Sequence, residues 1–478
     1  MLAMRRRPFA KRVADLSAGG RIDTSEFTPW PDHGLLVGGA VRDVLLGRRP
    51  HDVDWVVPDP AAAARAQSKA VDGPVFALDE ARGHWRVLAR SAGGGSVVHD
   101  FVPLSGAPDE ATAGYGTDHE ADLEADLERE LRRRDLTINA IAARPSGELI
   151  DPTGGVADLA AGRVRMTSLA AMRDDPVRPL RAVRFAGLLG FDLEHATRAA
   201  VSAMADDQLA GRAPLPAPER VRDELVAVLL AETAARTLSL AAELGVLATF
   251  LPELAATHGV EQGPLHHRDV LGHSLEAVHR LTRGFPDAGL ALRLATLLHD
   301  VGKPATASVH WTGRPTFHGH DKRGAELSQA ALRRLRFGND VVDHASSLVR
   351  YHMLPLPGSE KGARRFVHRH RRVLPDLLRL MIADREAARG RRANEVGRRT
   401  YRLAIARVLA VLAEAPPQAR LLDGEEVMAL LALRPGPRVG EALALVDEAV
   451  AVGDVKDRDD AEALLRRYAE AQGWTRDG

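Results

Sequence analysis

The chain has 478 residues, which is enough for two to four domains, and its 65 basic and 65 acidic residues give a formal net charge of zero. It contains no cysteine, which excludes disulfides and thiolate metal sites and leaves histidines and carboxylates as metal ligands. No apolar run approaches the roughly 18 residues of a membrane span, and the basic N-terminus lacks the apolar stretch of a signal peptide. We therefore expect a cytoplasmic protein without membrane contact; nothing in the pattern assigns an oligomeric state.

The stretch Leu35–Val57 is the first that combines local structure with chemistry. It predicts an apolar strand over Leu35–Val37, a turn at Gly38 and Gly39, a helix, and a second strand over Asp52–Val57. The glycines allow the backbone to approach a ligand closely, and the first turn of the helix offers free N–H groups to a phosphate.

The second strand places two carboxylates on one face. Because side chains alternate along a strand, Asp52 and Asp54 point to one side and Val53 to the other. Two such carboxylates suit magnesium, which prefers oxygen ligands and commonly bridges to substrate phosphates. The alternative interpretation is a plain turn followed by a solvated acidic pair, and the apolar run that begins at Trp55 disfavours it.

The run Gly38–Asp43 (GGAVRD), followed by Asp52–Asp54 (DVD), resembles the first motif of the class II CCA-adding tRNA nucleotidyltransferase and bacterial poly(A) polymerase family. The resemblance implies transfer of a nucleotidyl group from CTP or ATP to the 3′-hydroxyl of tRNA, with release of pyrophosphate. It assigns Asp52 and Asp54 as catalytic ligands of Mg²⁺, and Gly38, Gly39 and Arg42 as contacts of the triphosphate.

Three alternatives stay open. A poly(A) polymerase would perform the same chemistry with ATP alone, and a restricted enzyme would add only CC or only A. A protein of a different class would be an HD phosphohydrolase whose head only binds RNA. The resemblance implies an α+β protein with a polymerase-β-like nucleotidyltransferase head (1–165), a helical neck (166–260), an HD-type domain (261–400) and a helical tail (401–478).

Two further strands, Trp85–Leu88 and Val97–Leu104, are expected to extend the sheet of the head. Asp100 lies inside the second of them and is a candidate third metal ligand, the alternative being an exposed carboxylate at a strand edge. Residues Ser105–Glu120 have no periodicity and predict a mobile loop, where the family carries a flexible loop over its active site.

The segment Asp126–Ala142 predicts a helix and resembles the second motif of the family. By that resemblance Arg134, Asp135 and Asn139 hold the sugar and phosphates of the incoming nucleotide, and we expect Asp135 and Asn139 to share a helix face. The alternative is a polar helix with ordinary side-chain pairs. The turn at Asp151–Gly155 resembles the third motif, a hinge between head and neck, and could equally be a plain Asp-Pro turn.

The segment Arg173–Phe191 predicts a helix that Asp174 or Asp175 caps and Gly190 ends. Asp175 and Arg178 are three positions apart, so we expect an acceptor and a donor side by side, able to read the Watson–Crick edges of C and A. The resemblance assigns this pair as the base-selecting template; the alternative is a cap with its surface partner.

The other nucleotide-binding candidates on this helix are Arg181 and Arg184. By resemblance, Arg220 and Glu224 brace the helix and could reach RNA.

A series of histidines and acids follows from residue 273, including the run His299-Asp300-Val301-Gly302-Lys303. Imidazole and carboxylate together suit divalent metals, and two close ions can promote phosphoryl transfer to water. The pattern resembles the HD metal-dependent phosphohydrolase domain. By that resemblance the ligands of an unidentified divalent metal are His273, His299, Asp300 and Asp384, while His320 and His352 complete a second ion or bind the substrate phosphate. The implied substrate is a phosphoester at an RNA end, such as a 2′,3′-cyclic phosphate; a domain without turnover is the alternative.

Basic runs occur at Arg132–Arg134, Arg364–Arg372 and Arg385–Arg402. They could form a surface that follows the phosphates of tRNA, or simply be solvated arginine faces. From about Tyr401 the periodicity predicts helices without recognisable chemistry, for which the resemblance suggests support of RNA.

Overall fold

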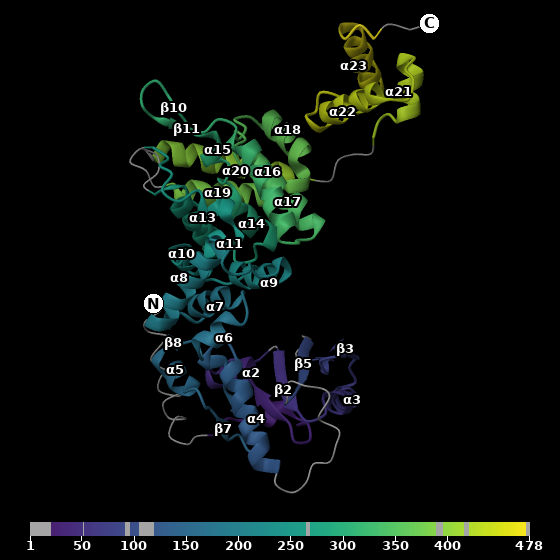
Figure 1. The fold of residues 1–478 in the computed structure, drawn as a ribbon. Helices are drawn as coiled ribbons and strands as arrows, with labels where there is room; N and C mark the ends of the chain where they lie inside the picture. The colour runs from purple at the N-terminus through teal and green to yellow at the C-terminus, as the bar shows by residue number, and fades with distance from the viewer. Residues whose placement is uncertain are drawn as a thin grey trace. The chain divides into compact units, whose positions relative to one another are not determined.

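The computed structural model describes residues 21–50, 52–90, 96–104, 119–263, 268–388, 395–414 and 420–474. The chain forms two compact units, residues 1–255 and 256–478. The first contains a mixed sheet with helices and the second is almost entirely helical (Figure 1), which confirms the expected α+β class. The loop expected over residues 105–120 lies almost wholly outside the described residues.

A seven-stranded sheet in the order β3-β4-β5-β2-β1-β6-β7 forms the head. Its strands are β1 (Leu35–Val37), β2 (Asp52–Val57), β3 (Val75–Asp79), β4 (His84–Arg90), β5 (Ser96–Pro103), β6 (Ala142–Ala143) and β7 (Leu149–Ile150). The central β2 pairs antiparallel with β1 and parallel with β5. The four predicted strands are confirmed. The others escaped prediction because β6 and β7 have two residues each and β3 is exposed at the sheet edge.

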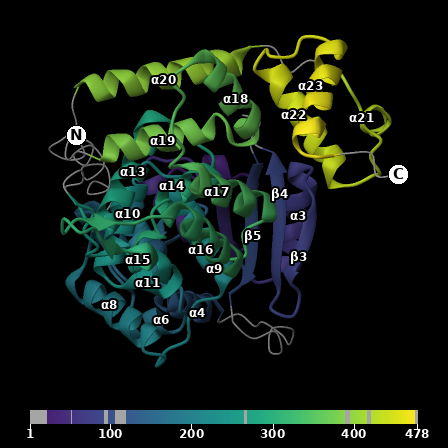
Figure 2. The same ribbon diagram turned by 90° about the horizontal axis from the view of Figure 1, so that it is seen from above.

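Helices cover this sheet. They are α2 (Gly39–Leu45), α3 (Pro60–Val71), α4 (His119–Arg133) and α5 (Gly155–Ala161), with the short η1 (Ser25–Phe27) before them. Leu127 and Leu131 of α4, one turn apart, pack against Val37 of β1 and Val56 of β2. Helix α3 lies along β3 and β4 (Figure 2). The sheet face that carries Val56 also carries Asp52 and Asp54, because side chains alternate.

The helix expected over Asp126–Ala142 is wrong beyond Arg133, where α4 ends. The carboxylate of Asp135 accepts the backbone N–H of Leu136 at 2.8 Å, an alternative to helical hydrogen bonding, and the chain continues into the 3₁₀ turn η2 (Thr137–Asn139). Asp135 and Asn139 are nevertheless neighbours, at 3.2 Å, through this turn rather than through a helix face.

The helix expected over Arg173–Phe191 begins only at Arg178, as α7 (Arg178–Leu189), with Val177 rather than Asp174 or Asp175 as its N-cap; the short α6 (Leu169–Arg173) ends where that helix was expected to start. The chain leaves the helical path at Asp175, a residue that Pro176 restricts because it precedes a proline, and the Asp175 carboxylate accepts the N–H of Val177 at 3.1 Å. Gly190 ends α7 with a φ of +71°, as predicted.

The rest of the first unit is helical apart from a two-stranded pair. The elements are β8 (Arg163–Val164), β9 (Asp192–Leu193), α8 (His195–Leu209), α9 (Pro218–Leu229), α10 (Ala234–Glu243), α11 (Val246–Phe250) and α12 (Pro252–Ala255). Helices α7 and α10 approach closely at Gly187, where an added Cβ would overlap the side chain of Thr237.

The second unit begins with helices that form the predicted HD-type bundle. Its elements are α13 (Val270–Gly284), α14 (Leu290–Leu298), α15 (Lys303–Thr306), β10 (Ser308–Val309), β11 (Pro315–Thr316), α16 (His320–Arg334), α17 (Asn339–Tyr351), α18 (Glu360–His370), η3 (Arg371–Val373), α19 (Asp376–Ala387), α20 (Glu395–Ala413), α21 (Gly424–Leu431), α22 (Pro437–Ala451) and α23 (Arg458–Ala471). The boundary expected at residue 400 falls inside α20, which runs beside α18 (Figure 2). Helices α21–α23 share an apolar core of their own. In the part of the chain that the structure describes, no helix has the length and apolarity to cross a membrane.

Candidate functional site

The predicted metal-binding carboxylates lie beside the predicted triphosphate turn. Asp54 on β2 pairs in register with Val37 on β1 and with Asp100 on β5. Gly38, which follows Val37, has a φ of +73°, and a Cβ there would lie 3.4 Å from Asp54 Oδ2 and would overlap the guanidinium of Arg134. Only glycine therefore allows this turn, a carboxylate and an arginine to meet so closely.

Three carboxylates lie close together on this face of the sheet, and their repulsion affects the ionisation of Asp54. Burial raises the pKa of Asp54 above its usual value; Arg134 opposes this shift, while the neighbouring carboxylates of Asp100 and Asp52 add to it. Asp100, the candidate third ligand, accepts two hydrogen bonds from Arg86, each 2.7 Å long. Asp52 and Asp54 therefore fit a divalent cation, whose charge would relieve their mutual repulsion.

Four of the predicted nucleotide-binding residues join one hydrogen-bonded network. Arg42 Nη1 donates to Asn139 Oδ1 at 2.6 Å, and Asn139 Nδ2 donates to Asp135 Oδ1 at 3.2 Å. Arg181 Nε donates to the other oxygen of Asp135 at 2.7 Å and its Nη1 to Glu224 at 3.2 Å. The network thus connects α2, the turn after α4, α7 and α9.

Three arginines of this region surround one aromatic ring that the sequence did not single out. The guanidinium carbons of Arg42, Arg181 and Arg184 lie 4.8, 5.6 and 4.1 Å from the ring centre of Phe185. Arg184 also donates to Glu224. Attraction to the ring face offsets part of the repulsion among the cations, so that positive charge can be concentrated for a polyanion such as a triphosphate.

Asp135 holds the network together as an anion. Burial on its own raises the pKa of Asp135, but Arg181, Asn139 and the N–H of Leu136 outweigh it and hold that pKa below its usual value. The Arg181 guanidinium is thus required to keep a buried charge compensated.

Asp175 and Arg178 are joined through the backbone, where the Arg178 N–H donates to the Asp175 carbonyl at 3.0 Å, but their side chains are bonded to different partners. Both oxygens of Asp175 accept from Arg220, at 2.8 and 2.6 Å. Arg178 donates from Nη1 to two backbone carbonyls, those of Arg133 (3.0 Å) and Ala171. The reason is that Asp175 lies in the turn before α7, so the helical spacing that would align the pair does not apply.

The basic runs are partly paired with acids. On α18, Arg365 and Arg369 both donate to Glu448 of α22 at 2.7 Å, and Arg364 contacts Glu414 of α20. In the first unit, Arg132 lies 3.3 Å from Glu128. Residues 389–394, in the middle of the third run, lie outside the described part of the chain.

The six predicted HD ligands meet in the second unit. They form two groups, His273, His299 and Asp384, and Asp300, His320 and His352, each with its ligand atoms within 4.8 Å of one another. They come from α13, the ends of α14 and α17, the start of α16, and α19.

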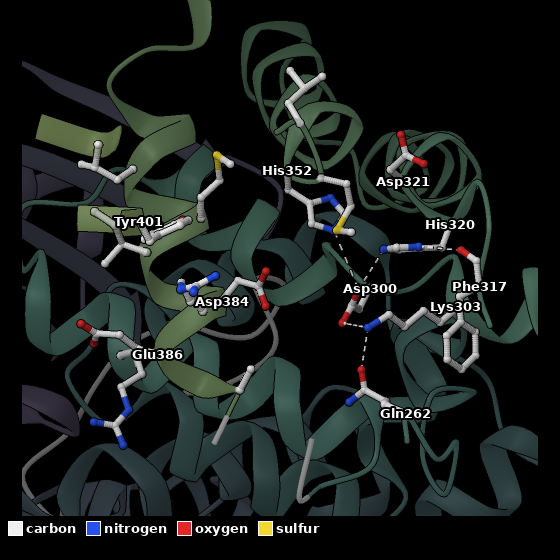
Figure 3. A pocket seen from close by; sticks show the side chains of 18 of the residues that line it. Gln262, Asp300, Lys303, Phe317, His320, Asp321, His352, Asp384, Glu386 and Tyr401 are labelled. Atoms are coloured by element: carbon white, nitrogen blue, oxygen red, sulfur yellow. Dashed lines mark hydrogen bonds and ion pairs between the residues drawn. The ribbon is translucent and has the colours of Figure 1, made fainter. Parts of the chain in front are cut away.

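Asp300, expected to join the first group, lies close to both groups, and Figure 3 shows it facing His320 and His352. Its Oδ2 is 3.2 Å from His299 Nε2, whereas its Oδ1 is 3.4 Å from His320 Nε2 and 3.9 Å from His352 Nε2. One carboxylate thus faces both histidine groups, an arrangement that suits two ions.

The histidines are oriented as metal ligands. In three of the four, Nδ1 bonds the backbone carbonyl three residues earlier, at 2.9 Å for His299, 2.7 Å for His320 and 2.6 Å for His352. Their Nε2 atoms are buried and have no hydrogen-bond partner among the described residues. Carbonyl contacts of this kind fix the tautomer whose Nε2 lone pair is free for a metal, so these residues fit a divalent cation.

The surrounding carboxylates favour the protonated form of one predicted metal ligand, His299. Burial alone would lower the pKa of His299, but the carboxylates of Asp300 and Asp384 reverse this and raise it. Burial lowers the pKa of His320, and it lowers that of His352 to about 4, so both stay neutral at pH 7. A cation entering this site must displace the proton of His299.

A lysine and a large cavity adjoin the cluster. Lys303 Nζ lies 2.7 Å from Asp300 Oδ2 and 2.5 Å from Gln262 Oε1 (Figure 3). In the sequence, Lys303 could be recognised from the run Val-Gly-Lys that follows His299-Asp300, but no role was predicted for it. The cavity of about 1800 Å³ opens onto Asp300 and Asp384 and extends to Tyr401 on α20.

Three family matches follow the order of these parts. Residues 35–165 match the family described as Poly A polymerase head domain, residues 190–257 that described as probable RNA and SrmB-binding site of polymerase A, and residues 270–389 the HD domain. The fold and sites define a nucleotidyltransferase head joined to an HD domain.

Curated relatives give the family. The chain is 51% identical over 446 residues to the A-adding tRNA nucleotidyltransferase of Deinococcus radiodurans. The aligned region covers 92% of this chain and 97% of that protein. It is 40% identical over 449 residues to the CC-adding tRNA nucleotidyltransferase of Thermus thermophilus, with 93% and 96% covered. The protein belongs to the tRNA nucleotidyltransferase family. The Bacillus stearothermophilus CCA-adding enzyme in complex with CTP shares its fold, with a TM-score of 0.59 at 23% identity over 92% of this chain and 94% of that one.

Proposed function

We propose that this protein adds CCA to the 3′ end of tRNA from CTP and ATP and releases pyrophosphate. The observation that carries the proposal is the contact of the Gly38 turn with both Asp54 and Arg134. It puts a phosphate-binding backbone, a metal-binding carboxylate and a cation at one place, which is what attack of a 3′-hydroxyl on an α-phosphate needs.

Each part has a defined role in that reaction. Mg²⁺ held by Asp52 and Asp54 would supply activation of the hydroxyl and neutralisation of the leaving phosphates. The Gly38–Gly39 turn binds the triphosphate together with Arg42 and Arg134, and the chain Arg42–Asn139–Asp135 keeps Arg42 in position. Since Arg42 is anchored before substrate arrives, little ordering is left for the binding step.

Base selection is assigned to Asp175 and Arg178. In the present arrangement Arg220 holds the carboxylate of Asp175, and Arg178 is held by carbonyls. A cytosine or adenine amine would replace Arg220 as the partner of Asp175, and a ring nitrogen would accept from Arg178. The pair of Asp175 with Arg220 is partly exposed, so exchanging it requires little energy.

A restricted activity is the second candidate, because the 51% identical relative is named an A-adding enzyme. The test uses the full chain, Mg²⁺ and tRNA transcripts that end before CCA, after the first C and after CC, each with CTP, ATP or both. We expect all three to be completed to CCA and then to stop. Extension of the CC transcript alone would assign A addition, and continuing A addition without CTP would assign a poly(A) polymerase. A transcript with a 3′-deoxy end, which lacks the attacking hydroxyl, is the control.

We also propose that the HD domain hydrolyses phosphoesters at RNA ends, on the observation that Asp300 faces both histidine groups. Two ions held by the six ligands would activate a water and stabilise the leaving oxygen. A cytoplasmic location and the domain boundaries at residues 165 and 260, both expected from the sequence, are proposed as well.

Metal binding to the HD cluster is expected to release about one proton at pH 7 and to tighten about tenfold per pH unit below the raised pKa of His299. Metal affinity increases with pH because the bound cation replaces the proton of His299. Titration calorimetry with Mn²⁺ in two buffers of different ionisation enthalpy measures this release. The Asp54→Asn protein, whose head site is disabled, should retain it, and His299→Ala should lose it. Binding without proton release would contradict the proposed ligand role of His299.

A further inference from the structure

The hairpin β10–β11 carries an aromatic ring almost wholly in solvent. Trp311 at its tip is 89% exposed, and Val309 beside it is 75% exposed. Large aromatic rings are normally buried, so this exposure marks a surface for a ligand.

The hairpin is a defined turn. His310 N–H donates to the carbonyl of Arg314 at 2.8 Å, and the Gly313 N–H donates to the carbonyl of His310 at 2.8 Å. The side chains of Ser308 and Thr316 bond across its base at 2.7 Å. The ring of Trp311 lies 5.3 Å from that of His310. The indole is therefore held outward by the backbone.

The charge around the ring suits a polyanion. Residues 301–320 contain no acidic residue, whereas they include the exposed Arg314 and His318. On α16 the exposed Lys322 and Arg323 follow Asp321, which accepts from Arg350. Arg323 donates to Glu326 at 2.9 Å, so that Lys322 is the cation that α16 adds to the hairpin. The hairpin segment itself offers cations and no carboxylate, which favours a phosphate backbone as its ligand.

The hairpin continues directly into the HD cavity. The segment from Pro315 to His320 lines that cavity, and His320 is one of the six clustered ligands. The carbonyl of Phe317 fixes Nδ1 of His320, and the ring of Phe317 lies 5.7 Å from Nζ of Lys303. A chain that runs along the hairpin from Trp311 therefore arrives at the metal-binding groups.

We propose that Trp311 stacks on an unpaired nucleobase of single-stranded RNA whose end enters the HD cavity. Stacking is tolerant of sequence, because every base has a π-face, and the exposed cations follow the backbone. This inference rests on the proposed phosphoester hydrolysis by the HD domain and adds the class of its ligand, an unpaired RNA end.

The test is a fluorescence titration of the full chain with the single-stranded hexanucleotide rA6. We expect quenching that Trp311→Phe abolishes, and a roughly tenfold weaker affinity for Trp311→Ala, measured by the anisotropy of labelled rA6. Trp311→Tyr, which keeps a stacking ring, should restore most of the affinity. Trp474→Phe is the matched control in the same unit and should leave the titration unchanged. A blunt duplex of equal length should quench little.

The outcomes separate this proposal from those it rests on. Quenching that Trp311→Phe abolishes and Trp474→Phe keeps assigns the signal to the hairpin rather than to another part of the protein. If Trp311→Phe leaves quenching and affinity unchanged, or if rA6 produces no quenching at low salt, the proposal is overturned, and the surface is left to another protein as partner. If quenching is present but the metal-loaded protein hydrolyses no 2′,3′-cyclic phosphate on rA6, RNA binding stands and the proposed hydrolysis falls.

Discussion

Replacing Asp54 with asparagine is expected to lower the rate of nucleotide addition by about 10³-fold or more, because a divalent cation bound there supplies several kcal/mol of charge stabilisation in the transition state. The same change should not lower stability. Burial raises the pKa of Asp54, so its ionised form is disfavoured in the folded protein. The resulting destabilisation is absent at pH values below the usual carboxyl pKa and grows as the pH rises through the raised pKa of Asp54. An asparagine at this position does not ionise, so it does not destabilise the fold in this way.

The measurement pairs single-turnover addition with melting in the absence of divalent ions at pH 5 and pH 8. We expect Asp54→Asn to melt at or above the wild-type temperature, with the larger difference at pH 8. Asp72→Asn is the matched control, since Asp72 is an exposed acid at the end of α3 whose left-handed backbone asparagine also tolerates. A variant that kept wild-type addition would remove Asp54 from the mechanism. A variant that lost addition together with stability would point to a structural role.

The residues that could be predicted are those whose placement follows from local geometry. Asp52 and Asp54 share a face because any strand alternates, and Gly38 precedes a helix because the glycine pair punctuates the pattern. The six HD ligands could be chosen as a set by residue type and resemblance. Their division into two groups with Asp300 close to both required the packing of five helices, which no spacing in the sequence expresses.

The failures occurred where side chains compete with the backbone or pair over long separations. Asp135 bonds its neighbour's N–H and ends a helix that periodicity would continue, and Pro176 separates α6 from α7. Asp175 bonds Arg220, which lies 45 residues away. Helical spacing describes neighbours only within a helix, so it could not predict this partner.

Replacing Arg181 with methionine is expected to destabilise the protein by about 3 kcal/mol, a fall in melting temperature of roughly 10 °C. The side chain of Asp135 is 6% exposed, and Arg181 is the largest of the influences that keep it ionised. Without the guanidinium, a buried charge is left uncompensated, and Glu224 loses one of its two arginines.

The pH dependence gives this prediction a definite sign. In the wild type the lowered pKa of Asp135 stabilises the fold above the usual carboxyl pKa, and that stabilisation is lost only as the pH falls through the lowered value. In Arg181→Met the burial of Asp135 dominates and raises its pKa, so the charge destabilises the fold at neutral pH. The gap between the two proteins should therefore shrink between pH 8 and pH 5 in calorimetric melting curves.

Arg212→Met is the matched control, because its ion pair with Asp207 is also 2.7 Å long but its side chain is 63% exposed, and it should change stability by less than about 1 kcal/mol. Addition should fall about 10²-fold in Arg181→Met, since Asp135 would no longer position Asn139 and, through it, Arg42. Arg181→Lys should recover part of the stability but less of the rate, because a single ammonium cannot span Asp135 and Glu224 as the guanidinium does. If Arg181→Met and Arg212→Met behaved alike in both measurements, the network would be an incidental surface arrangement and the positioning of Arg42 would need another cause.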